Sequence, residues 1–297
     1  MKKPDKSLIY PLFIPMQGCP GSCVYCDQRK ISGSREFDLA QAEREAEVFV
    51  RRNVSRPKEI AFYGGTFTAL PRIVQAKYLS AIKALLEPKD SIRISTHPAY
   101  IDMDTLDFLK ENRVNTIELG IQDFDDNVLA KSGRGYDGKT AIHAARMVQG
   151  ARFCLGIQLM PGLPGSTEHT RLSNLEQINL LAPDLLRLYP TIVIQGTRLA
   201  TMYAEGEYQP LSLRDAINIC ADYHEPCSQR GIRIIKQGIP SNLSPQDIIA
   251  GPWHSAFGEL VKQELLRRRL LAEPHLADNL DKAELNLLKA HGGTVFP

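Results

Sequence analysis

Short apolar segments alternate with longer amphipathic segments along most of this 297-residue chain. The short segments are rich in β-branched and aromatic residues and predict strands at residues 8–14, 59–63, 92–96, 116–121, 153–160 and 185–189. Apolar residues spaced three to four apart predict helices at residues 40–52, 73–86, 103–112, 139–149, 168–181 and 213–230. Six strands, each followed by a helix, indicate parallel strands joined by right-handed crossovers. We therefore expect an α/β fold, a partial (β/α)6 barrel of the TIM-like kind.

The alternation of strands and helices stops near residue 240. Residues 241–258 are rich in proline, glycine and serine, and two helical segments follow at residues 259–271 and 281–291. We expect a core domain at residues 1–240 and a small, mostly helical C-terminal extension at residues 241–297.

The cysteines are too few and too unevenly spaced for a disulfide framework. Three of the six, Cys19, Cys23 and Cys26, fall within eight residues that also contain glycine and proline. Such crowding indicates metal binding in a reducing compartment. No apolar stretch approaches the roughly 18 to 20 residues needed to cross a membrane. We therefore expect a cytoplasmic protein with no membrane partner.

The overall charge of the chain is small. A net charge of +2 excludes the strongly basic surface of a domain that grips nucleic acid over a whole face. Any contact with RNA must come from a local patch. The tract Arg267-Arg268-Arg269, with Lys262 on the same predicted helix, is the strongest candidate for phosphate contacts. The alternative is an ordinary solvated helix face.

The clustered cysteines have the spacing C-x3-C-x2-C, directly after the first predicted strand. This spacing lets one tight loop wrap three corners of a cubane iron–sulfur cluster. The fourth iron is then left without a protein ligand and is free to bind another molecule. The alternative is a zinc site, but structural zinc takes four ligands, and other candidate ligands lie far away in the sequence.

With Tyr25 directly before the last cysteine, this loop resembles that of the radical S-adenosylmethionine (SAM) superfamily. The resemblance implies that Cys19, Cys23 and Cys26 hold a [4Fe–4S] cluster and that Tyr25 lies near the adenine of SAM. It implies an enzyme in which one electron, from a donor such as flavodoxin or ferredoxin, cleaves SAM to a 5′-deoxyadenosyl radical. The three cysteines are then both metal ligands and catalytic residues.

Further residues of the resemblance follow the second and fourth predicted strands. The superfamily has a glycine pair at the position of Gly64-Gly65-Thr66, where it meets the methionine amino group. Residues 120–124 resemble the G-[VI]-Q-[DS]-F segment of oxygen-independent coproporphyrinogen oxidases and of the elongator catalytic subunit. That likeness implies that Gln122 binds the ribose hydroxyls and that Arg134 lies near the SAM carboxylate. The alternatives are an ordinary turn for the glycine pair, a satisfied surface amide for Gln122 and a solvated guanidinium for Arg134.

The chain also departs from these relatives. Ser95 stands where they usually carry glutamate, and Gln158 where the porphyrin oxidases carry aspartate, which argues against a porphyrin substrate. The elongator family spaces its first two cysteines much farther apart, and its acetyltransferase domain is not found in this sequence. We therefore expect a short relative of the bacterial type.

Residues 188–197 and 212–240 also resemble the elongator catalytic subunit, which acts on transfer RNA. We therefore expect tRNA as the substrate. Two alternatives remain open at this point: a small-molecule radical reaction of the porphyrin-oxidase type, and an iron–sulfur protein that no longer turns over SAM.

Overall fold

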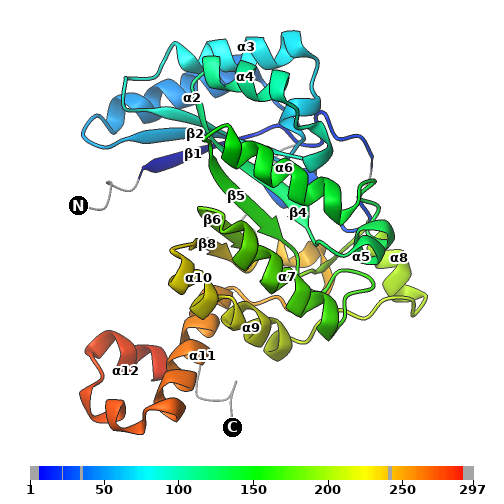
Figure 1. The fold of residues 1–297 in the computed structure, drawn as a ribbon, viewed down its shortest axis with the longest axis vertical. Coiled ribbons are helices and arrows are strands. Elements are labelled where there is room, and N and C mark those ends of the chain that lie inside the picture. Colours follow the sequence, from blue (N-terminus) through cyan, green and yellow to red (C-terminus); the bar gives the residue numbers. More distant parts are fainter. Residues whose placement is uncertain (1–6, 22, 34–35, 240–242, 290–297) are drawn as a thin grey trace.

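The computed structural model describes residues 7–21, 23–33, 36–239 and 243–289. Its centre is a sheet of seven parallel strands, curled into an open half-barrel, in the order β1-β2-β3-β4-β5-β6-β8 (Figure 1). The predicted fold class is thereby confirmed. The strands are β1 (Leu8–Phe13), β2 (Lys58–Tyr63), β3 (Ser91–Thr96), β4 (Val114–Gln122), β5 (Cys154–Leu159), β6 (Leu185–Leu188) and β8 (Arg233–Gln237).

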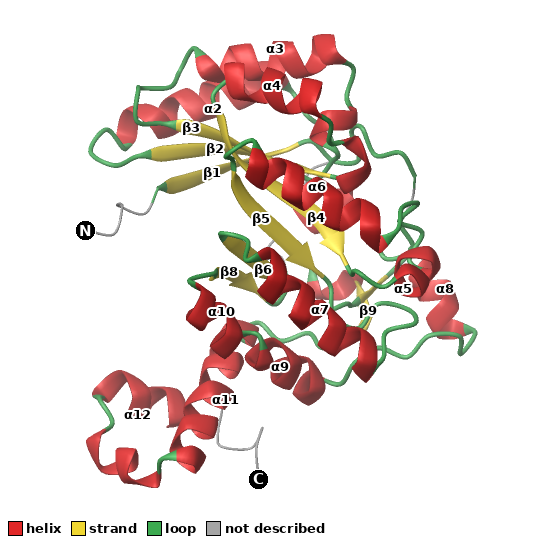
Figure 2. Ribbon diagram, in the orientation of Figure 1, coloured by secondary structure: helices red, strands yellow, loops and turns green. Residues whose placement is uncertain are grey.

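Most of the helices cover the convex face of this sheet, whereas the short helix at Gln28–Ser32 borders the concave side (Figure 2). Several begin at a side-chain cap that satisfies their first N–H groups, such as Asp38, Asp102, Asp137 and Thr167. The helices are α1 (Gln28–Ser32), α2 (Leu39–Arg52), α3 (Arg72–Lys83), α4 (Met103–Glu111), α5 (Asp126–Lys131), α6 (Gly138–Gly150), α7 (Glu168–Leu181), α8 (Arg198–Ala204), α9 (Leu213–Asp222) and α10 (His224–Arg230). Short 3-10 turns lie at Phe67–Ala69, Pro98–Tyr100, Pro245–Asp247 and Pro274–Asn279.

Side chains alternate between the two faces of the sheet, as the pleat of a strand requires. Ile60, Ile94 and Ile117 are fully buried in the core between the sheet and the helices. The concave face is different, because polar and charged side chains point into its interior from the alternate positions, among them Glu59, Arg93 and Arg187. The half-barrel therefore has an apolar outer layer and a polar lumen.

Two local predictions differ from the structure. The strand β8 is additional to the six predicted strands, because its segment has only two apolar residues, Ile234 and Ile235, and lies at the sheet edge. The single helix predicted at residues 213–230 is wrong: α9 and α10 are separate helices that meet at Tyr223. Pro226 has no N–H to donate to the carbonyl four residues earlier, so the first helix cannot continue through it.

The C-terminal region begins with a small second sheet, in which β9 (Ile248–Ala250) pairs antiparallel with β7 (Val193–Ile194). Then α11 (Phe257–Ala272) packs on α9, and α12 (Lys282–Lys289) packs on α11 (Figure 1). The expected boundary at residue 240 lies outside the described residues. None of the described helices is long and apolar enough to span a membrane.

The arginine tract of α11 holds helices together. Arg267 and Arg268 both form ion pairs with Glu264, at 2.8 and 2.7 Å. Arg268 also reaches Asp222 at the end of α9, at 2.7 Å. Arg269 pairs with Glu284 of α12, again at 2.7 Å. Each guanidinium of the tract thus already has a carboxylate partner, and a phosphate would have to compete with it.

Candidate functional site

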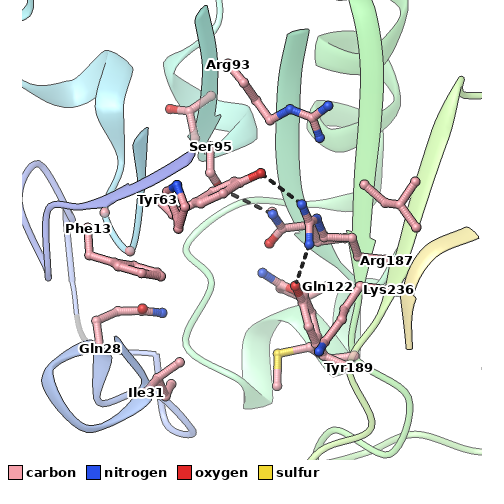
Figure 3. A pocket seen from close by; sticks show the side chains of 18 of the residues that line it. Phe13, Gln28, Ile31, Tyr63, Arg93, Ser95, Gln122, Arg187, Tyr189 and Lys236 are labelled. Carbon is pink, nitrogen blue, oxygen red and sulfur yellow. Dashed lines mark hydrogen bonds between the residues drawn. The ribbon is translucent and has the colours of Figure 1, made fainter. Parts of the chain in front are cut away.

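A cavity of about 780 Å³ occupies the lumen of the half-barrel. In Figure 3, Phe13, Gln28 and Ile31 border it opposite Gln122, Tyr189 and Lys236. The structure brings all of the predicted site residues, from four separate segments of the chain, to the lining of this one cavity: Cys19, Cys23, Tyr25, Cys26, Gly64, Gly65, Thr66, Gln122 and Arg134.

The start of the cysteine loop is fixed by backbone pairing with the end of β2. The N–H of Met16 donates to the carbonyl of Gly64 at 2.8 Å, and the N–H of Thr66 donates to the carbonyl of Gln17 at 2.9 Å. A Cβ atom at Gly65 would lie 2.4 Å from that same Gln17 oxygen. Loop packing therefore explains why position 65 requires glycine, independently of any ligand.

Each thiol of the loop accepts a hydrogen bond from a different side chain. All three cysteines are free, so no disulfide competes for the sulfurs. Hydrogen bonds to the sulfurs are one of the means by which a protein sets the reduction potential of an iron–sulfur cluster. The three contacts are Thr66 Oγ1 to Cys19 Sγ at 3.6 Å, Arg134 Nη1 to Cys23 Sγ at 3.0 Å and Gln28 Nε2 to Cys26 Sγ at 3.5 Å.

The chemistry of this donor set fits an iron–sulfur cluster. Three free thiols face one lumen, and burial raises the pKa of the Cys26 thiol to about 12, so a metal must displace its proton. In the part of the chain that the structure describes, no group of three or more histidine, cysteine, aspartate or glutamate side chains is placed to hold a single ion. The ligands of a cubane bind separate irons and need not converge on one point.

Gln122 ends β4 in an unusual conformation. Its φ of 71° is in the left-handed region, and the pairing of β4 with β5 shifts register between Gly120 and Gln122. Other non-glycine residues with positive φ, such as Arg113 and Arg152, simply follow the end of a helix. The buried Gln122 Oε1 has no hydrogen-bond partner within the described residues. A ligand hydroxyl would satisfy it, so the strained backbone and the unpaired acceptor both fit a ligand site.

The guanidinium of Arg134 lies between the cysteine loop and β4. Besides Cys23, its Nη1 is 3.4 Å from the hydroxyl of Tyr25, and its Nη2 donates to the carbonyl of Gly120. Its Nε is 3.4 Å from the hydroxyl of Tyr136. Most of its N–H groups are therefore engaged within the protein. A bidentate contact with a carboxylate of SAM would require some of them to change partners.

His97 is hydrogen-bonded to the backbone of Arg134. Its Nδ1 accepts from the N–H of Ala99 at 3.3 Å, so its Nε2 carries the proton and donates to the carbonyl of Arg134 at 3.0 Å. Burial, together with the nearby Arg134 charge, lowers the pKa of His97 to about 4, so the ring is neutral at pH 7. The sequence provides no metal-like spacing around His97, and its role depends on a contact between distant segments.

A ladder of buried ion pairs crosses the lumen away from the cysteines. Arg93 joins Glu59 to Glu118, with contacts of 2.5 Å to each carboxylate. Arg187 then pairs with Glu118 at 2.6 Å and donates to the Tyr63 hydroxyl at 2.8 Å (Figure 3). Burial by itself raises the pKa of the Glu118 carboxyl, but the two guanidinium groups outweigh it and hold this pKa below its usual value. The ladder is thus charged and internally balanced.

The two positions at which the sequence departs from its relatives are in contact. The Gln158 amide donates to Ser95 Oγ at 3.3 Å and to Glu118 Oε2 at 2.9 Å. Gln158 therefore belongs to the ladder, and Ser95 lies beside it.

Two family matches cover most of the chain. Residues 13–178 match the radical SAM superfamily, and residues 183–267 match the radical SAM C-terminal domain. The chain belongs to the radical SAM superfamily. It is accordingly an enzyme of this superfamily, whose members generally use a [4Fe–4S] cluster and SAM.

The relatives include proteins of different length. An uncharacterized protein of Methanocaldococcus jannaschii is 25% identical over 288 residues, which is 91% of this chain and 88% of the relative. The tRNA uridine(34) acetyltransferase of Methanocaldococcus infernus is 25% identical over 71% of this chain. The oxygen-independent coproporphyrinogen III oxidase of Pseudomonas aeruginosa is 28% identical over 60% of it. The chain spans less than half the length of the latter two, 43% and 41%.

The fold is shared with a solved structure. Elp3 of Methanocaldococcus infernus, with an N-terminal deletion, superposes with a TM-score of 0.71 at 19% sequence identity, over 90% of this chain and 64% of Elp3. The expected likeness to elongator and porphyrin-oxidase relatives is confirmed.

Proposed function

We propose that this protein binds a [4Fe–4S] cluster through Cys19, Cys23 and Cys26, binds SAM in the lumen next to it, and modifies tRNA. The observation that carries the first part is the convergence of three free thiols, the unpaired Gln122 oxygen and Arg134 on one cavity. When bound, the cluster supplies the electron that splits SAM and produces a 5′-deoxyadenosyl radical.

The residues around this cavity provide binding and shielding. Gln122 Oε1 accepts from a ribose hydroxyl, and the Thr66, Gln28 and Arg134 side chains stabilise the thiolates through their hydrogen bonds. Tyr25 is buried against the small apolar cluster of Val24, Val128 and Leu163. Buried surroundings of this kind exclude water from the place where a reactive radical forms.

The substrate part of the proposal comes from the relatives. Two proteins named tRNA uridine(34) acetyltransferase are 25% and 29% identical to this chain, over 71% and 57% of its length. A tRNA substrate must carry hydrogen atoms accessible to the lumen, and a base or sugar extruded from a loop meets that requirement.

We expect Gln122→Ala to retain the cluster and to bind SAM about 10- to 100-fold more weakly, because one or two hydrogen bonds to the ligand are lost, worth roughly 1.5 to 3 kcal/mol. Equilibrium dialysis of anaerobically reconstituted protein measures this affinity. Gln229→Ala is the matched control, since that exposed amide donates to Glu225 on its own helix and is not part of the cavity lining. Unchanged SAM affinity in both Gln122→Ala and Arg134→Ala would remove these residues from the binding site.

We expect cells that lack this protein to lose one modified nucleoside from their tRNA. Mass spectrometry of digested tRNA detects the change, and a gene encoding the intact chain restores the nucleoside whereas a Cys23→Ala gene does not. An unchanged tRNA nucleoside profile, together with an altered small metabolite, would instead support a small-molecule substrate.

A further inference from the structure

A β-bulge in β8 places two consecutive side chains on the lumen face. Leu186 pairs with Ile234, but the next residue of β6, Arg187, pairs with Lys236, so Ile235 is an extra residue. Both Ile235 and Lys236 consequently line the cavity, where a regular strand would turn one of them away. Bulges of this kind occur next to ligand sites, where they redirect a side chain.

The Lys236 ammonium has no counter-ion among the described side chains. Glu59 is the carboxylate among the described residues that line the cavity, and it pairs with Arg93. Glu118, buried beside the cavity, pairs with Arg93 and Arg187. In the part of the chain that the structure describes, Lys236 has neither an ion pair nor a side-chain hydrogen bond. Figure 3 shows it extending from β8 into the pocket. Lys236 is thus a half-buried cation without a partner among the residues that the structure describes.

The other cation near the cysteines does not compete for that partner. Arg134 already donates to Cys23, to Gly120 and toward two tyrosine hydroxyls. An anionic group that enters the lumen therefore meets the ammonium of Lys236 as the more available donor. An ammonium in a site screened from bulk water attracts such a group more strongly than one on the surface.

We propose that Lys236 is an oxyanion-binding residue of this cavity, taking a carboxylate or phosphate group of a molecule held there. The inference rests on the proposed function, which supplies both sources: SAM carries a carboxylate and RNA carries phosphates. In either case Lys236 orients the ligand along the lumen, opposite the loop that carries the cysteines.

The test compares five forms of the full-length, cluster-reconstituted protein: wild type, Lys236→Gln, Lys236→Met, Lys236→Arg and Arg230→Gln. Arg230 is exposed at the end of α10 and serves as a charge-matched control outside the cavity. Equilibrium dialysis measures the affinity for SAM and, separately, for inorganic phosphate. Iron content per chain confirms that each variant is folded, and Lys236→Met provides a second neutral variant.

We expect Lys236→Gln to lower the affinity for at least one of the two ligands, SAM or inorganic phosphate, by about 10- to 100-fold. Lys236→Arg should stay close to wild type, and Arg230→Gln should match it. A loss of SAM affinity identifies the SAM carboxylate as the group bound, and a loss of phosphate affinity alone identifies a phosphate of the substrate.

The inference is overturned if Lys236→Gln and Lys236→Met bind both ligands as wild type does, or if wild type binds neither. Wild-type protein that fails to bind SAM but binds phosphate through Lys236 would reject the proposed SAM site and retain this inference. The two failures are therefore distinguishable.

Discussion

Replacing Cys23 with alanine is expected to abolish both the iron–sulfur cluster and SAM cleavage. The C-x3-C-x2-C loop provides three thiolates, so a cubane that loses one has two irons without protein ligands. Arg134 Nη1 also donates to the Cys23 sulfur at 3.0 Å, and the variant loses this contact. Reconstituted wild type should carry about four irons per chain, whereas the variant should carry none. Iron analysis and the yield of 5′-deoxyadenosine measure the two effects.

Cys154→Ala is the matched control for this experiment. Cys154 lines the same cavity, but it lies on β5 and is separate from the cysteine loop. We expect it to leave both iron content and SAM cleavage unchanged. A Cys23→Ala protein that kept its visible cluster absorption and still cleaved SAM would show that the cluster assignment is wrong.

Replacing Glu118 with glutamine is expected to lower the free energy of unfolding by about 3 to 5 kcal/mol, because it removes one charge from a buried ion-pair network and leaves one positive charge uncompensated. Glu118 is 1% exposed and contacts both Arg93 and Arg187. Arg93 retains Glu59, but Arg187 loses its carboxylate. Denaturant unfolding monitored by circular dichroism measures the change.

The surface variant Glu47→Gln provides the comparison, because its ion pair with Arg51 is exposed and worth less than about 1 kcal/mol.

The pH dependence of stability offers a second check. The pKa of Glu118 is lower in the folded protein than in the unfolded chain. Its contribution to the free energy of unfolding is therefore fully present above the unfolded-state pKa, and it is lost as the pH falls through the folded-state pKa. The difference between wild type and Glu118→Gln should therefore shrink in acid. A difference below about 1 kcal/mol at pH 7 would mean that the ladder contributes little to stability.

The fold is predictable from the sequence wherever one face of a strand is apolar. β2, β3 and β4 each place isoleucines in the convex core, which is the pattern that strand prediction detects. The apolar pattern does not predict β8, because β8 is an edge strand whose lumen face carries Arg233 and Lys236. The break between α9 and α10 depends on a single proline, Pro226, within an otherwise helical pattern.

The candidate site is predictable where its residues are close together in the sequence. Local sequence motifs make the cysteine loop and the segments after β2 and β4 recognisable, and the structure brings these segments to one cavity. His97 and Gln28 are not predictable from the sequence. His97 donates to a backbone carbonyl and Gln28 donates to a cysteine sulfur, and both contacts form only in the folded chain. The ladder leaves a weak signal, since Glu59, Arg93 and Glu118 are charged residues inside apolar strands. Recognising it requires the register of the sheet.

The open half-barrel leaves β1 and β8 as edge strands, and unpaired edges are templates on which a second chain can add a strand and begin to aggregate. Both edges carry features that oppose this. Pro11 interrupts the row of N–H donors in β1, and the bulge at Lys236, with exposed Arg233 nearby, distorts and charges β8. The lumen can thus remain accessible from the side without offering a surface for growth of an intermolecular sheet.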